Sequence, residues 1–160
     1  MKHEHSQAEM FAGTSGSGVK DMPSEHNKIM TQKCIECHTY NGKPEADTMP
    51  SEKGGHTFRL DESVCLKCHH HKPEDMLVEW NKKITPLLTQ LKDLLDKYPD
   101  KLSKTYIAIN RNYALVASDG GMQIKGIHNP KYAIDLLQYS ISALTVDSNW
   151  KMDNQGVKSK

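Results

Sequence analysis

The sequence predicts a mostly α-helical protein in which a loop-rich N-terminal half packs against a C-terminal bundle of about three helices. Most of the apolar residues fall beyond residue 75, where they recur at the three- and four-residue intervals of amphipathic helices. Over the whole chain only 36% of residues are apolar and 6% aromatic. The N-terminal half is therefore predicted not to fold on its own side chains, and a large apolar cofactor would supply the missing core.

Residues 1–25 are polar and rich in glycine, so we expect a flexible segment there with little regular structure. Residues 26–73 form the predicted cofactor-binding module, with a turn-rich loop near its middle. Residues 74–147 are the predicted helical part, and residues 148–160 a polar tail.

The first long helix should begin after Pro73 and stop before Pro99, with Pro86 kinking or splitting it. A second helix is predicted over residues 100–116. Its buried residues should be Leu102, Tyr106, Ile109 and Tyr113.

A third helix should open at Asn129-Pro130, because asparagine can cap a helix and proline suits its first turn. It is expected to bury Tyr132, Leu136, Leu137, Ile141 and Leu144.

Two segments of the module share one pattern, Cys34-Ile35-Glu36-Cys37-His38 and Cys65-Leu66-Lys67-Cys68-His69. The pattern is typical of covalent attachment of haem c, in which both thiols add to the haem vinyl groups and the following histidine ligates the iron. All 4 cysteines of the chain lie in these motifs. We therefore expect two haems c, with His38 and His69 as the proximal ligands.

A structural zinc site is the main alternative, because two Cys-x-x-Cys pairs can supply four thiolates to one ion. A zinc site made of four thiolates does not need a histidine directly after both pairs, however. A thioredoxin-like dithiol is less favoured, since no βαβ pattern surrounds either motif.

Two haems that only transfer electrons gain from a second strong ligand on each iron. The remaining histidines compete for these two distal positions. His26, His56 and His128 are better placed than His70 and His71, which adjoin a proximal ligand, or His3 and His5, which lie near the terminus.

Several connecting segments resemble the later part of multihaem cytochromes c of the quinol-oxidising, membrane-anchored and related periplasmic type. These segments are residues 9–24 before the first motif, residues 55–59 before the second and residues 126–133. The order of histidines and motifs is also similar to the last two haems of pentahaem ammonia-forming nitrite reductases.

The likeness to these reductases implies that His26 ligates the haem on Cys65 and Cys68, and that His128 ligates the haem on Cys34 and Cys37. His56 would then serve a haem outside this chain, or be an alternative distal ligand. The catalytic haem of these reductases has lysine in place of the motif histidine, and neither motif here ends in lysine. The resemblance therefore implies electron relay and not nitrite chemistry.

A net charge of +1 gives no sign of nucleic-acid binding, and no run of eighteen or more apolar residues predicts a membrane span. The first residues do not form a secretory signal. Since haem c is attached outside the cytoplasm, we expect a periplasmic or otherwise extracytoplasmic protein that is either mature or, as we favour, one piece of a longer multihaem cytochrome.

The sequence thus predicts a dihaem electron-transfer protein and not an enzyme. Its expected partners are redox proteins, such as other multihaem cytochromes or a quinol-oxidising membrane cytochrome. The alternatives are a small haem reductase or peroxidase-like enzyme with one open iron site, and a zinc-binding domain.

Overall fold

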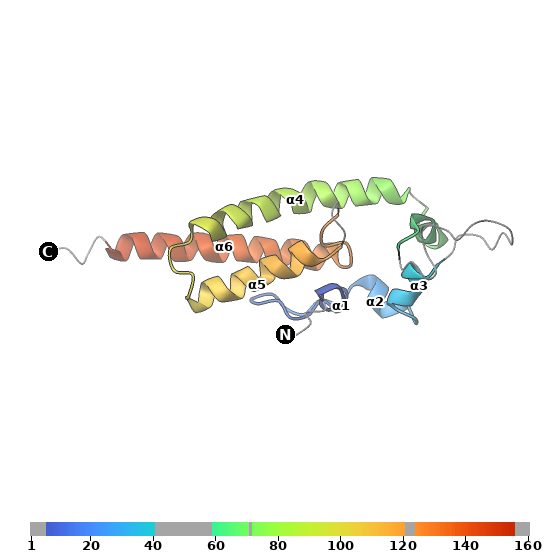
Figure 1. Cartoon of the computed structure of the whole chain (residues 1–160), viewed down its shortest axis with the longest axis horizontal. Coiled ribbons are helices and arrows are strands. Elements are labelled where there is room, and N and C mark those ends of the chain that lie inside the picture. Colours follow the sequence, from blue (N-terminus) through green and yellow to red (C-terminus); the bar gives the residue numbers. More distant parts are fainter. Residues whose placement is uncertain (1–5, 41–58, 71, 121–123, 156–160) are drawn as a thin grey trace. The chain divides into compact units, whose positions relative to one another are not determined.

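The computed structural model of the chain describes residues 6–40, 59–70, 72–120 and 124–155, and these residues form helices and no strands (Figure 1). The elements in order are α1 (Ser6–Ala12), α2 (Glu25–Ile29), α3 (Cys34–His38), the 3-10 helix η2 (Glu62–Lys67), α4 (Pro73–Lys97), α5 (Lys104–Ser118) and α6 (Pro130–Gln155). The mostly helical class is confirmed. None of the helices in the described part of the chain is long and apolar enough to cross a membrane.

The chain divides into two compact units. The first, which we call the helical unit, consists of Met1–Ser24 and Trp80–Lys160, and the second, the motif unit, is Glu25–Glu79. We describe each by itself.

The helical unit has its own apolar core, formed by α1, the later part of α4, α5 and α6. The predicted apolar face of α6 is confirmed, since Tyr132, Leu136, Leu137 and Leu144 are fully buried and Ile141 packs partly buried against them. The other core residues are Met10, Ile84, Leu91, Leu95, Tyr98, Ile109, Leu115, Val116 and Ala133.

The first long helix was predicted to be kinked or split at Pro86, and the split is wrong because α4 continues through this residue from Pro73 to Lys97. A proline inside a helix removes one backbone hydrogen bond, here the bond to the carbonyl of Lys82. Both residues are exposed, so water can solvate that carbonyl and the cost of the lost bond is reduced.

α5 begins at Lys104, later than predicted, because a turn precedes it. The Asp100 carboxylate accepts a hydrogen bond from the backbone N–H of Leu102 (3.1 Å), and the Ser103 hydroxyl caps the helix by accepting from the N–H of Tyr106 (3.1 Å). Leu102 therefore lies ahead of the helix and is 87% exposed, so its predicted burial is wrong. The start of α6 is confirmed, since the Asn129 side chain accepts from the N–H of Tyr132 (3.3 Å).

The expectation of little regular structure over residues 1–25 is wrong for Ser6–Ala12, which form α1. α1 buries Met10 completely, and the following glycine-rich segment is held by specific bonds. The Tyr132 hydroxyl accepts from the N–H of Gly16 (3.0 Å), and Gly18 has φ of 78° with no room for a side chain against the ring of Tyr139. Glycine is used here for close approach to α6 and for a left-handed backbone.

Asn112, fully buried on α5, connects three parts of the helical unit. Its amide oxygen accepts from the N–H of Ser17 (2.8 Å), and its amide nitrogen donates to the Ser17 carbonyl (2.9 Å) and the Ser140 hydroxyl (3.0 Å).

Replacing Asn112 with alanine should lower the free energy of unfolding by about 2 kcal/mol, because it leaves the buried Ser140 hydroxyl and the partly buried backbone of Ser17 without their partner. Asn110→Ala, at an exposed position on the same helix, is the matched control. Thermal unfolding of the mature protein checks this, with Asn112→Ala several degrees below the control. Equal melting temperatures would show that the network contributes little.

Candidate haem-binding site

Both Cys-x-x-Cys-His motifs form a helical turn in the motif unit. The first is α3, whose end is closed by the N–H of Thr39 donating to the Ile35 carbonyl (3.0 Å). The second spans the end of η2, where the N–H of His69 donates to the Cys65 carbonyl (2.9 Å). Residues three and four apart share one face of a helical turn, so each motif presents its two thiols and its histidine on the same side.

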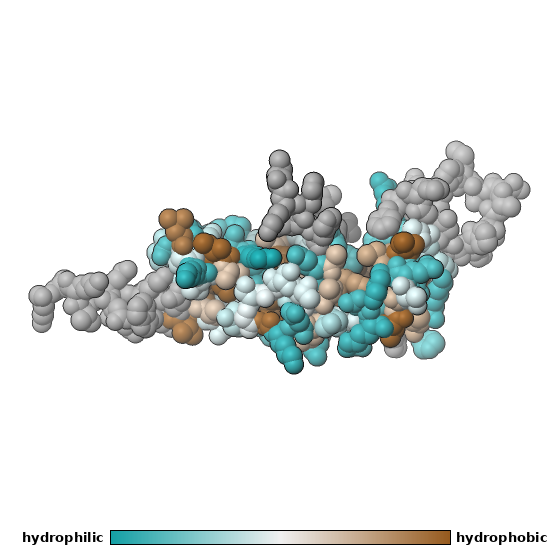
Figure 2. Space-filling view, turned by 90° about the horizontal axis from the view of Figure 1, so that it is seen from below, coloured by the Kyte–Doolittle hydropathy of each residue, from teal (hydrophilic) through white to brown (hydrophobic). Residues whose placement is uncertain are grey.

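Among the described residues of the motif unit only Val64 and Pro73 are buried. The larger aliphatic residues Ile29, Ile35 and Leu66 are more than half exposed. Exposed hydrophobic residues, brown among the teal hydrophilic ones, can be seen in Figure 2. As predicted from the composition, the described residues of this unit do not build a core from their own side chains, which is the condition under which a large apolar cofactor can complete a fold.

The two motifs lie close to one another within this unit. Burial, and next the neighbouring Cys65, raise the pKa of the Cys37 thiol. The Lys67 ammonium of the second motif lies 3.7 Å from the centre of the Tyr40 ring, just after the first. Cys34 and Cys68 are exposed and all four thiols are free, so they are accessible for addition to a vinyl group.

His26, on α2, contacts the proximal histidine of the second motif. The centroids of the His26 and His69 rings are 5.9 Å apart, with their planes at 79°. The contact is edge-to-face, and it brings two histidines together beside the second motif, where both would be available to hold one iron.

The surroundings of His26 favour its neutral form. Burial, and next the proximity of His69, lower its pKa. Neutral imidazole is the form that binds a metal, so His26 stays competent as a ligand below the pH at which an ordinary histidine takes up a proton.

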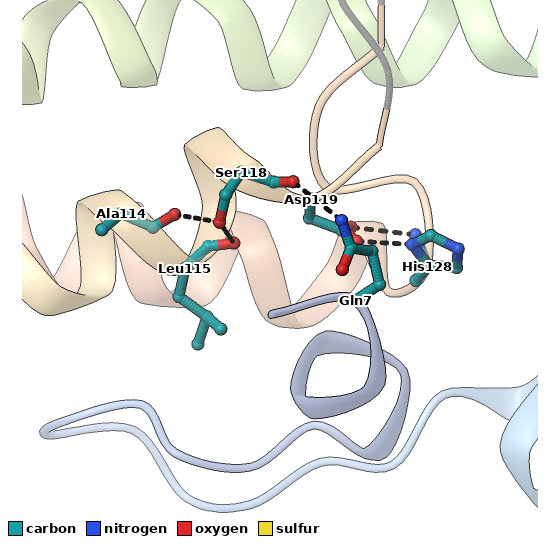
Figure 3. Close-up of polar contacts among 6 residues, drawn as sticks. All are labelled: Gln7, Ala114, Leu115, Ser118, Asp119 and His128. Atoms are coloured by element: carbon teal, nitrogen blue, oxygen red, sulfur yellow. Dashed lines mark hydrogen bonds and ion pairs between the residues drawn. The ribbon is translucent and has the colours of Figure 1, made fainter. Parts of the chain in front are cut away.

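His128 belongs to the helical unit, in the loop before α6. Its Nδ1 lies 2.5 Å from a carboxylate oxygen of Asp119, the residue that caps the end of α5 (Figure 3). The sequence analysis missed Asp119. The sequence does carry a signal for this contact: an acidic residue at a helix end, followed by a glycine pair and then by a histidine.

The other candidate histidines are placed as follows. His38 closes α3 and is half-buried, and His70 is exposed. His3, His5, His56 and His71 lie outside the described residues.

The zinc alternative requires four converging thiolates. All four cysteines are described, yet within the described ranges no three or more His, Cys, Asp or Glu side chains gather in a way that could hold a metal ion.

No protein-family model matches the chain, and no curated protein matches it. Among solved structures, it is similar to the crystal structure of outer cell wall cytochrome OcwA, with a TM-score of 0.66 and 24% sequence identity. The likeness covers 86% of this chain and 29% of that cytochrome, so this chain spans less than a third of its length. The chain therefore shares its fold with a segment of an outer cell wall cytochrome.

Proposed function

We propose that the chain is a dihaem c-type cytochrome, or the dihaem segment of a longer one, that transfers electrons. Cys34 and Cys37 hold one haem and Cys65 and Cys68 the other, and the histidine after each pair is the proximal ligand. The observation that carries the proposal is the 5.9 Å separation of the His26 and His69 rings beside the second motif. When bound, haem c supplies one-electron chemistry at its iron.

We propose that a histidine of the chain fills the second coordination position of each haem iron, which leaves no open position for a substrate. His26 would be the second ligand of the haem on Cys65 and Cys68, and burial, followed by the proximity of His69, lowers its pKa and so favours the neutral form that binds a metal. His128 would be the second ligand of the haem on Cys34 and Cys37, a pairing that rests on the resemblance described above alone. His56 is the alternative ligand for that second position.

The likeness to an outer cell wall cytochrome supports a location outside the cytoplasm. It also favours the view that this chain acts with further haem-bearing segments, because it spans only part of that protein. The partners we propose are redox proteins, namely other multihaem cytochromes or a quinol-oxidising membrane cytochrome.

The competing function is a small haem reductase or peroxidase-like enzyme in which one iron keeps an open position. Carbon monoxide binds only to a ferrous haem that has a vacant or weakly held position, so it distinguishes the two.

We expect the reduced native protein to bind no stoichiometric carbon monoxide, because strong ligands fill both faces of each haem. The check is an absorption spectrum of the reduced, mature protein before and after addition of the gas. Rapid binding of one equivalent would reassign the protein to the enzyme class.

A further inference from the structure

A cation of the second motif lies beside the first motif. The Lys67 ammonium is 3.7 Å from the centre of the Tyr40 ring, and Tyr40 follows the proximal histidine of the first motif by two residues. Both residues belong to the motif unit, which also contains all four cysteines. A cation is attracted to the negative face of an aromatic ring, so Tyr40 holds the Lys67 head group next to the first motif.

The charge of Lys67 also acts on a thiol to which the first haem would be attached. Burial is the main reason why the pKa of the Cys37 thiol is raised, and the Lys67 ammonium acts against that rise. A positive charge stabilises a nearby thiolate, and the same Coulomb force acts on any other charge at this place.

Carboxylates lie beside the second motif. The Asp61 carboxylate caps η2 by accepting from the backbone N–H of Ser63 (3.0 Å). Glu62 is three residues before Cys65 in this 3-10 helix, where residues three apart eclipse one another. Burial raises the pKa of the Cys65 thiol, and among the nearby charges Glu62 raises it most. The two motifs therefore lie in unequal electrostatic surroundings.

We infer that Lys67, held in place by Tyr40, raises the reduction potential of the haem on the first motif relative to that of the haem on the second. The inference rests on the proposed attachment of a haem at each motif. Ferrous haem carries one positive charge less than ferric haem, so a fixed cation favours the reduced state and fixed carboxylates favour the oxidised one. The cation therefore shifts an electron shared by the pair towards the haem of the first motif.

A merely structural role of this contact predicts a different result. Lys67 is exposed, and a cation over a ring at an exposed position contributes little to stability. Loss of a structural contact would not change one haem potential according to the charge at position 67.

The test is a redox titration of the full, mature dihaem protein followed by NMR, in which the haem methyl signals identify each haem through its own motif. Two unit charges on the order of 10 Å apart change an equilibrium by about tenfold at an effective dielectric constant of about 20. Solvent screening of an exposed lysine reduces this effect, so we expect a change of about three- to tenfold in Lys67→Gln. At about 59 mV per tenfold, the potential of the first haem minus that of the second should fall by about 30–60 mV.

Two variants control for the charge itself. Lys67→Arg keeps the charge and adds a planar group that stacks on an aromatic ring, so it should retain the parent difference between the two potentials. Lys72→Gln removes the same charge from another exposed position of the motif unit and should leave the difference near its original value.

A double-mutant cycle tests whether Tyr40 acts through Lys67. Tyr40→Leu should lower the difference as well, because the ammonium loses the ring that holds it. In the Lys67→Gln background the same change should have no further effect. A direct effect of the Tyr40 ring on the haem would instead add to the effect of Lys67→Gln.

An unchanged difference in Lys67→Gln, an equal change in Lys72→Gln, or additive effects in the cycle would overturn the inference. The mass of each denatured variant separates these results from a failure of the proposed function. A chain without haem would disprove the proposed function, and the inference with it. A chain with two haems and an unchanged difference in Lys67→Gln would disprove the role of Lys67 alone.

Discussion

Replacing both Cys65 and Cys68 with alanine should leave a protein with one haem and a largely unfolded motif unit. Only Val64 and Pro73 are buried among the described residues of that unit, so we expect the fold there to depend on the cofactor. The helical unit should remain folded, because it has a core of its own.

The measurements are the mass of the denatured chain and limited proteolysis of the native one. We expect cleavage to concentrate between residues 25 and 79, while α5 and α6 stay protected. The matched control replaces Leu66 and Lys67 with alanine, which changes two residues in the same motif and keeps both thiols. A double-cysteine variant that resists proteolysis as well as this control would show that the motif unit folds without the second haem.

His26→Ala should keep both haems attached but convert the one on Cys65 and Cys68 from low-spin to high-spin. The His26 and His69 rings lie 5.9 Å apart beside the second motif, and His26 would be the second ligand of the iron that His69 holds, so removing its ring would open a coordination position. Reduced His26→Ala should then bind about one equivalent of carbon monoxide, against none for the parent protein. Lys28→Ala, an exposed change on the same helix, is the control.

His128→Ala should affect the haem on Cys34 and Cys37. The variant that carries both His26→Ala and His128→Ala should therefore bind carbon monoxide at both haems. A low-spin spectrum that is unchanged in His26→Ala would place another histidine at that iron, with His56 as the first candidate.

The sequence predicted those features that local chemistry determines. The capping of α6 by Asn129 and Pro130, and the helical periodicity that gives its buried face, each depend on neighbouring residues. The two cysteine motifs are likewise short enough to be recognised alone.

The features that the sequence did not predict depend on contacts between distant residues. The segment around Gly16 seemed a flexible linker because its partners, Asn112 and Tyr132, lie about a hundred residues away. Leu102 fitted a helical pattern, but the turn at Asp100 moved the helix start past it. Local pattern also gave no reason to pair Asp119 with His128, since the two lie nine residues apart in the sequence.

The central claim is that each Cys-x-x-Cys-His motif carries one covalent haem. The most direct measurement is the mass of the full chain, denatured after maturation in a host with cytochrome c assembly, together with its visible spectrum. The account predicts a mass increased by two haems, with the colour retained on the denatured polypeptide. A colourless chain of unmodified mass, binding zinc stoichiometrically when native, would contradict it.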